Sequence, residues 1–283
     1  MGKTRPTSEF NAQNVTTADV DRLAAALDAQ DSADGVRRLR AWAHAALDAR
    51  PGEAAVDIGS GTGTVVRDLA AAVTDKGSAL GIEPNPGLRA LAERRAAEAG
   101  STGRFAAGEA SALPLADASV DVVWCERVLQ HLSDPEQAVA EIARVLRPGG
   151  RAVLLDTDWA TTILHPGDPE TVAVLTSATL TAAANPYAGR KLTGQLSAAG
   201  LVVDDRGSQA LLQDHNSVAW PLIRMLAESA VRRGLIDEKR RDLLYADLTE
   251  AAAHGALHMS VTMFGALAHK PAQGPAQKSP SAT

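Results

Sequence analysis

The chain has almost no cysteine: Cys125 is the single one among 283 residues. One cysteine excludes an intrachain disulfide and any metal site of the Cys-x-x-Cys kind. We therefore expect neither redox nor zinc chemistry, and no metal in the functional site.

Long apolar runs are missing too. No stretch is long enough to span a bilayer, and residues 1–6 lack the apolar centre of a secretory signal. These absences predict a cytoplasmic protein without a membrane partner.

Positive charge is in short supply. Lysine and arginine number 28 against 34 acidic residues, which gives a formal net charge of −6. Because binding to a phosphate backbone requires a basic surface, nucleic acid is a poor candidate partner. A small-molecule substrate is expected instead.

The most informative segment present is residues 55–63, Ala-Val-Asp-Ile-Gly-Ser-Gly-Thr-Gly. An apolar strand here runs directly into a glycine turn and then into a helical pattern. Glycine suits a sharp turn that approaches a ligand closely, and helix-start amides point toward a negative group. The segment predicts a site for a nucleotide-type cofactor.

The spacing of the glycines argues against a dinucleotide-binding site. The third glycine of that fingerprint is replaced by Thr64 or Val66, depending on the frame. Glu83 ends the next apolar run, and a carboxylate about twenty residues past the turn suits a ribose diol. A nicotinamide-dependent oxidoreductase is therefore a disfavoured alternative.

Further motifs follow in a fixed order, in residues 108–115, 120–125, 128–135 and 146–155. With the glycine turn, they make the chain resemble the class I S-adenosylmethionine-dependent methyltransferases, most closely those similar to ubiquinone/menaquinone-biosynthesis and natural-product enzymes. The resemblance covers residues 35–210 well and the last strand, near 259–268, more loosely.

The resemblance implies an α/β, Rossmann-like, doubly wound and mostly parallel sheet of seven strands, the last antiparallel. The apolar runs predict strands at 54–58, 78–82, 103–106, 119–124 and 151–156. We expect three regions: a helical cap (1–50), a methyltransferase domain (51–270) with lid insertions near 159–190 and 215–255, and a disordered tail (271–283).

The resemblance also implies which residues bind S-adenosylmethionine. They are Asp57, Gly59, Ser60, Gly61, Glu83, Pro84, Glu109, Ala110 and Cys125. The amides of the glycine turn would meet the methionine carboxylate, and Asp57 would orient the loop or meet the ammonium group. Glu83 would take the ribose hydroxyls and Glu109 the adenine amino group. Cys125 would contribute backbone only, its thiol being buried.

A base would help a hydroxyl or acidic carbon accept the methyl group. The candidates are His131, His165 and Asp158, each with a purely structural role as the alternative. Arg127 is a candidate for holding an anionic substrate. Trp159, Tyr187 and Trp220 are candidates for an apolar wall.

The resulting prediction is methyl transfer to an oxygen, nitrogen or carbon atom of a small organic molecule. The alanine-rich, arginine-over-lysine composition is compatible with a GC-rich bacterium, where natural-product biosynthesis is a common setting. A non-methylating or accessory protein that retains the cofactor site is the alternative, because fold does not fix function.

Overall fold

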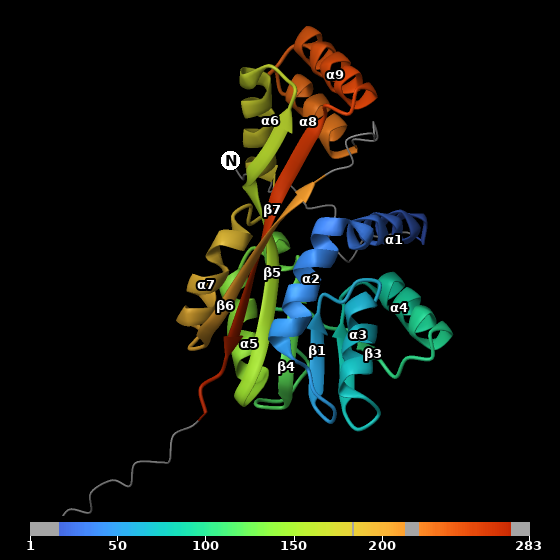
Figure 1. Ribbon diagram of the computed structural model, residues 1–283, viewed down its shortest axis with the longest axis vertical. Helices are drawn as coiled ribbons and strands as arrows, with labels where there is room; N and C mark the ends of the chain where they lie inside the picture. Colours follow the sequence, from blue (N-terminus) through green and yellow to red (C-terminus); the bar gives the residue numbers. More distant parts are fainter. Residues whose placement is uncertain (1–16, 183, 213–220, 273–283) are drawn as a thin grey trace, which may run out of the picture.

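Seven strands form one sheet in the computed structural model, which describes residues 17–182, 184–212 and 221–272 (Figure 1). The strands are β1 (Ala54–Ile58), β2 (Ser78–Ile82), β3 (Arg104–Ala106), β4 (Val120–Glu126), β5 (Leu146–His165), β6 (Val202–Leu212) and β7 (His258–His269). Their order is β3-β2-β1-β4-β5-β7-β6, and only β7 runs antiparallel to its neighbours. The predicted α/β fold with an antiparallel last strand is confirmed.

Helices lie on both faces of this sheet and beyond its end. The described helices are α1 (Thr17–Ser32), α2 (Asp34–Leu47), α3 (Thr64–Val73), α4 (Pro86–Glu98), α5 (Pro135–Val145), α6 (Pro169–Ala182), α7 (Ala188–Ala198), α8 (Pro221–Arg232) and α9 (Glu238–Ala253), with a short 3₁₀ turn η1 (Leu129–His131). Apolar residues of α2 and α3 pack on one face, and those of α5 and α7 on the other. The sheet is therefore the middle of three layers, as crossover connections require.

Side chains of β4 show how one strand serves both faces. Val122 and Trp124 pack with α2 and α3, whereas Val123 and Cys125 pack with α5 and α7. This alternation follows from the two-residue period of a strand. Because both faces are buried, β4 reads as a continuous apolar run, which is why its position was predictable.

The fifth strand is much longer than the sequence predicts. Instead of 151–156, β5 spans Leu146–His165, because its outer part pairs with β7 from Ile163↔Ser260 to His165↔His258. The strand β6 was not placed by the sequence pattern, and β4 reaches Glu126 rather than residue 124. These differences come from pairing with other strands: the outer part of β5 pairs with β7 about a hundred residues later, β6 also pairs with β7, and the end of β4 pairs with β5.

The β5–β7 ribbon projects beyond the sheet and bears a cluster of three helices, α6, α8 and α9 (Figure 1). These helices share an apolar core that includes Leu175, Ile223 and Leu244. They fall within the predicted insertions, although the first of those begins as strand rather than helix. Trp220 and most of the predicted tail (273–283) lie outside the described residues.

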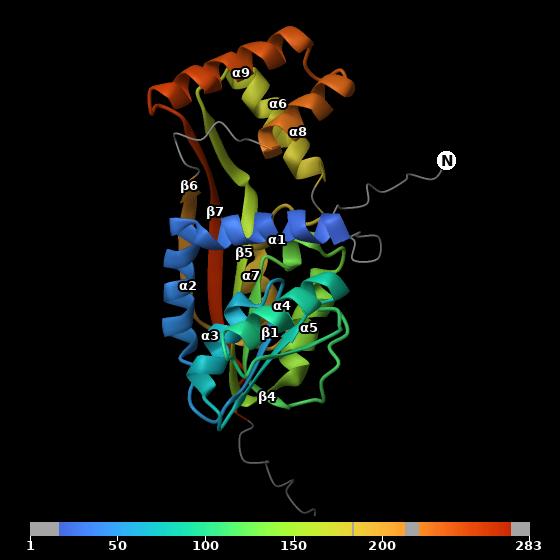
Figure 2. The same cartoon turned by 90° about the vertical axis from the view of Figure 1, so that its right-hand side faces the viewer.

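The first described helix, α1, lies across the end of the sheet from which the ribbon projects (Figure 2). Arg95 of α4 forms two hydrogen bonds of 2.7 Å with Asp28, which fastens α1 to the sheet's flank. No described helix is long and apolar enough to cross a membrane.

Candidate functional site

A cavity of about 1640 Å³ lies between α1, the strand ends and the α6–α8 helices. Open α/β sheets bind ligands beyond the carboxyl ends of their strands, where this cavity lies. Its wall includes these predicted cofactor residues: Asp57, Gly59, Ser60, Gly61, Glu83, Pro84, Glu109 and Ala110. Residues far apart in the sequence thus meet around one space.

The glycine turn has the backbone that its sequence predicts. Gly59, Gly61 and Gly63 have φ values of +71°, +51° and +80°, a region that glycine adopts without steric cost. A Cβ on Gly59 would also lie 2.4 Å from Val128 Cγ2. No other residue type fits at Gly59 without moving the segment after β4.

The amides of this turn are already used within the protein. Gly59 N and Ser60 N donate to Ile82 O (2.8 and 3.2 Å), and Gly61 N donates to Glu83 Oε2 (3.0 Å). This corrects the expectation that these amides meet the methionine carboxylate. Their hydrogen bonds instead fasten the turn to β2.

Other donors near the turn are better placed for an anion. The Ser60 hydroxyl is buried and has no hydrogen-bond partner among the described residues. The first turn of α3 follows at once, and the leading amides of a helix have no partner within it. Ser60 Oγ and the start of α3 are therefore available to a negatively charged group.

Glu83 is fixed at the end of β2 with its side chain 6% exposed. Its two carboxylate oxygens accept from Gly61 N (3.0 Å) and Asn85 N (2.9 Å). Burial raises the pKa of this carboxyl, and these two hydrogen bonds oppose the rise. Each oxygen keeps a second lone pair, so the carboxylate retains the capacity to accept both hydroxyls of a ribose.

Asp57 is a buried carboxyl on the cavity wall, 4% exposed. Within the described residues, no donor forms a hydrogen bond with its carboxylate. Burial raises its pKa well above the ordinary aspartate value, and the negative charge of Glu126 raises it further. A buried carboxylate without a donor is costly, so this position favours a cationic ligand group.

Pro84, Glu109 and Ala110 line the opposite part of the cavity. Ala110 is buried, whereas the Glu109 side chain is exposed. This exposure leaves the Glu109 carboxylate free to turn toward a ring edge, and its predicted role at the adenine stays a prediction.

Cys125 does not line the cavity. Its thiol packs in the core between the sheet and α5 and α7, and burial raises its pKa well above the ordinary value. The next residue, Glu126, reaches the cavity in its place. The predicted burial of the thiol agrees with the structure, whereas the structure gives no support to the predicted backbone contact.

His131 ends η1 and lines the cavity. Loss of hydration and the positive charge of Arg127 lower the pKa of its imidazole below the ordinary value. The ring is therefore neutral at pH 7 and able to accept a proton.

Asp158 is not available as a base. It is fully buried, and its carboxylate is paired with the guanidinium of Arg190, whose Nη2 lies 2.8 Å away. Strand alternation explains the error: Thr157 and Trp159 line the cavity, while Asp158 points to the other face of β5.

His165 also lies away from the cavity. It lines a separate small pocket with Asp247, Glu250 and His254. The preceding residue of β5, Leu164, does line the cavity. Because side chains alternate along a strand, His165 lies on the other face of β5, and this is the reason that the prediction fails.

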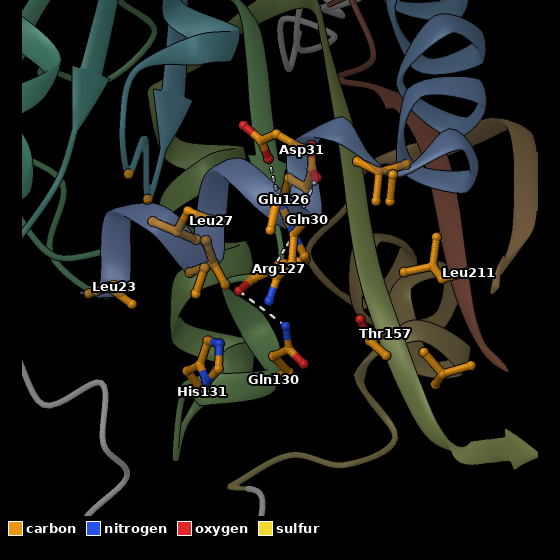
Figure 3. A pocket seen from close by; sticks show the side chains of 18 of the residues that line it. Leu23, Leu27, Gln30, Asp31, Glu126, Arg127, Gln130, His131, Thr157 and Leu211 are labelled. Carbon is orange, nitrogen blue, oxygen red and sulfur yellow. Dashed lines mark hydrogen bonds and ion pairs between the residues drawn. The ribbon is translucent and has the colours of Figure 1, made fainter. Parts of the chain in front are cut away.

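Gln130 is a cavity residue that the sequence analysis missed. Its Oε1 accepts from Trp159 Nε1 (2.8 Å) and its Nε2 donates to Arg127 O (3.4 Å), while Thr157 lies close by (Figure 3). Trp159 is thus part of the wall, as predicted, but Tyr187 is not among the lining residues. The position of Gln130 beside His131, in the motif at residues 128–135, was the signal available in the sequence.

A ring of four charged side chains fastens α1 over the site; three of them, Asp31, Glu126 and Arg127, are labelled in Figure 3. Arg127 lies 2.8 Å from Asp31 and 3.2 Å from Glu126, and Arg40 lies 2.7 Å from each of the same two carboxylates. Arg127 adopts φ +56°, an uncommon conformation that such contacts stabilise. It therefore binds α1 rather than standing free for an anionic substrate.

Comparison with known proteins agrees with this architecture. Residues 56–154 match the model of a methyltransferase domain. The chain is 43% identical over 133 residues to an uncharacterized 37.1 kDa protein in transposon TN4556 of Streptomyces fradiae, covering 47% of this chain and 38% of that protein. It is 41% identical over 120 residues to an uncharacterized methyltransferase of Mycolicibacterium paratuberculosis, covering 42% and 44%. The chain thus spans less than half the length of these relatives.

A solved structure extends the likeness over most of the chain. A putative methyltransferase from Bacillus halodurans superposes with a TM-score of 0.56 at 16% identity, covering 84% of this chain and 99% of that one. At this identity the likeness shows the fold. The methyltransferase domain matched at residues 56–154 is the part of the chain that supports S-adenosylmethionine as the cofactor.

Proposed function

We propose that this protein transfers a methyl group from S-adenosylmethionine to a small organic molecule, in the setting of bacterial natural-product biosynthesis. The observation that carries the proposal is the single cavity, in which the glycine turn, Glu83 and His131 share one space. Cavities for one drug-sized ligand measure about 300–1,000 Å³. The larger volume here is sufficient for a cofactor together with an acceptor.

The residues present fit S-adenosylmethionine in three separate ways. Asp57 is a buried carboxyl without a hydrogen-bond donor, which suits an ammonium group. The unpartnered Ser60 hydroxyl and the start of α3 suit a carboxylate. Glu83 suits a ribose diol. The cavity therefore offers an acceptor for a cation, donors for an anion and a carboxylate for a diol, which supports the proposed cofactor.

The chemistry supplied by the cofactor is an electrophilic methyl group on a sulfonium, which a nucleophile displaces in line. The chain's own task is to hold the acceptor close and aligned, an effect that can lower a barrier by several kcal/mol. Gln130, held by Trp159, and the Thr157 hydroxyl are available to orient a polar group of the acceptor.

His131 is the residue that we propose as base. For a hydroxyl acceptor, the proton leaves as the new O–C bond forms, and the neutral imidazole receives it. Its lowered pKa keeps the ring unprotonated near pH 7.

Calorimetry with S-adenosylmethionine and S-adenosylhomocysteine tests the cofactor site. Glu83→Ala removes two charge-assisted hydrogen bonds, each worth about 1.5–3 kcal/mol. We expect affinity to fall by at least ~100-fold. Glu141→Ala is the matched control, because Glu141 also accepts from a backbone amide, that of Leu113, but lies outside the cavity.

The outcomes separate the functional alternatives. No binding to the folded wild type would contradict the methyltransferase proposal, and binding of a reduced nicotinamide cofactor would favour the oxidoreductase. Binding, followed by a mass increase of one methyl group in an acceptor, supports the proposal. If S-adenosylmethionine binds but keeps its methyl group in the presence of every acceptor of a broad panel, a non-methylating or accessory role is favoured.

A further inference from the structure

The cavity continues away from the cofactor residues into a second part, here called the distal chamber. Its walls come from the outer half of β5, the ends of β6 and β7, and helices α6 and α8. The residues are Thr162, Leu164, Val172, Leu175, Thr176, Thr179, Leu211, Leu212, Ile223, Leu226, Met259 and Val261. The β5–β7 ribbon and the helices it bears therefore form a wall that the core fold alone would lack.

Threonines in this wall are less polar than their residue type implies. The hydroxyls of Thr162, Thr176 and Thr179 donate to the carbonyls of Trp159, Val172 and Leu175, at 2.7, 3.0 and 3.0 Å. A hydroxyl that is already donating offers little to a ligand, and the methyl group remains. These positions act as apolar surface.

Charge is confined to the other part of the cavity. Its charged lining residues come from α1, α2 and the segments around the ends of β1 to β4. Within the described residues, β5, β6, β7, α6 and α8 contribute none to the lining. Burying an unpaired charge there would cost several kcal/mol, whereas apolar surface is favoured by about 25 cal/mol per Å².

Polar groups return where the chamber meets the cofactor part. Thr157, the Gln130 amide and His131 line this junction, and Thr157 and Gln130 point toward the same space in Figure 3. Along β5, Thr157 and Leu164 are at most about 23 Å apart. A ligand that reaches both needs a polar end and a long apolar body.

We propose that the acceptor is an uncharged molecule with an elongated apolar body, which occupies the distal chamber and places one hydroxyl at Thr157, Gln130 and His131. The assignment of this molecule as acceptor rests on the proposed methyl transfer. The chamber itself is a property of the fold, so its ligand class is testable separately.

Straight-chain alcohols are suitable probes. With the protein saturated in S-adenosylhomocysteine, binding of hexanol, octanol and decanol is measured by calorimetry. Each added methylene buried in the chamber should raise affinity about fourfold, the equivalent of about 0.8 kcal/mol. Decanoate, of the same length but charged, should bind at least tenfold more weakly than decanol.

Two neighbouring residues of α6 provide a matched pair of variants. Thr176 lines the chamber, whereas Ser177 is exposed and does not. Thr176→Glu should weaken decanol binding at least tenfold without changing affinity for S-adenosylhomocysteine, and Ser177→Glu should change neither. Thr179→Glu repeats the test at a second wall position should Thr176→Glu fail to fold.

Affinity that does not depend on alcohol chain length, or decanoate bound as tightly as decanol, would overturn the proposal. So would full decanol binding in folded Thr176→Glu and Thr179→Glu proteins. If the wild type does not bind S-adenosylhomocysteine at all, the proposed methyl transfer is overturned instead. Alcohol binding measured without the cofactor product would still report on the chamber.

Discussion

Replacing Asp57 by asparagine is expected to stabilise the ligand-free protein while weakening cofactor binding. The Asp57 carboxyl is 4% exposed, and no hydrogen bond from the described residues stabilises its charged form. Burial and the charge of Glu126 raise its pKa. The folded protein therefore holds this proton to a higher pH than the unfolded chain does, and stability is lost as pH rises above about 4.

The two effects have sizes that standard assays resolve. Removing an unsatisfied buried charge should add about 1–3 kcal/mol at pH 8, with a Tm increase of ~2 °C for each kcal/mol. Losing a charge-assisted contact with the ammonium group should cost about 1.5–3 kcal/mol, or 10- to 150-fold in Kd. Asp68→Asn is the control, because Asp68 is 55% exposed on α3.

Calorimetry over a range of pH adds a second readout. The ammonium group stabilises the charged carboxylate, so in the pH range where Asp57 titrates a proton should be released on binding, and the measured enthalpy of the wild type should there depend on the buffer's heat of ionisation. Asp57→Asn should lose this dependence. A variant that is less stable than the wild type, or that binds S-adenosylmethionine equally well, would refute the reasoning.

Two further predictions concern pH and catalysis. Burial raises the pKa of Asp156 to about 7 from an ordinary 3.8, so the folded state binds more protons than the unfolded chain and stability should fall as pH rises from about 4 to 7. Asp156→Asn should flatten the plot of Tm against pH, with the exposed Asp117→Asn as the control. An unchanged slope would argue against this cause. His131→Gln should lower kcat by about 10²- to 10⁴-fold at unchanged affinity for S-adenosylhomocysteine. Because the pKa of His131 is lowered, the acid limb of the wild-type rate profile should lie below pH 6.5. His165→Gln should leave kcat unchanged, and equal losses in both variants would contradict the assignment of the base.

The parts of the site that the sequence predicted are those set by local geometry. The strand Ala54–Ile58 and the glycine turn after it follow from a buried apolar run and from positive φ values. Glu83 was predictable because it ends the next run. These residues lie at adjacent strand ends, and neighbouring strand ends of a parallel sheet meet at one edge, so their position in the sequence already brings them together.

The parts that failed depend on pairing between distant segments. The length of β5 is set by β7, about a hundred residues later, and the alternation along this strand places Leu164 on the cavity and His165 away from it. The side on which Asp158 lies is set by strand alternation, which a one-residue change in register reverses. The residues next to His165 and Asp158 in the sequence therefore indicate neither how long β5 is nor which face of the strand each side chain occupies.

The sequence by itself determined the class of the fold, the glycine turn and the carboxylate at the end of β2, because short-range periodicity and the steric needs of glycine are set by consecutive residues. Only the tertiary structure decided which donors remain free for the carboxylate, which histidine reaches the cavity and how α1 is fastened over it. Those outcomes depend on hydrogen bonds and ion pairs between residues far apart in the chain, such as Arg127 with Asp31. The distal chamber, too, exists only because the β5–β7 ribbon carries α6 and α8 over the end of the sheet.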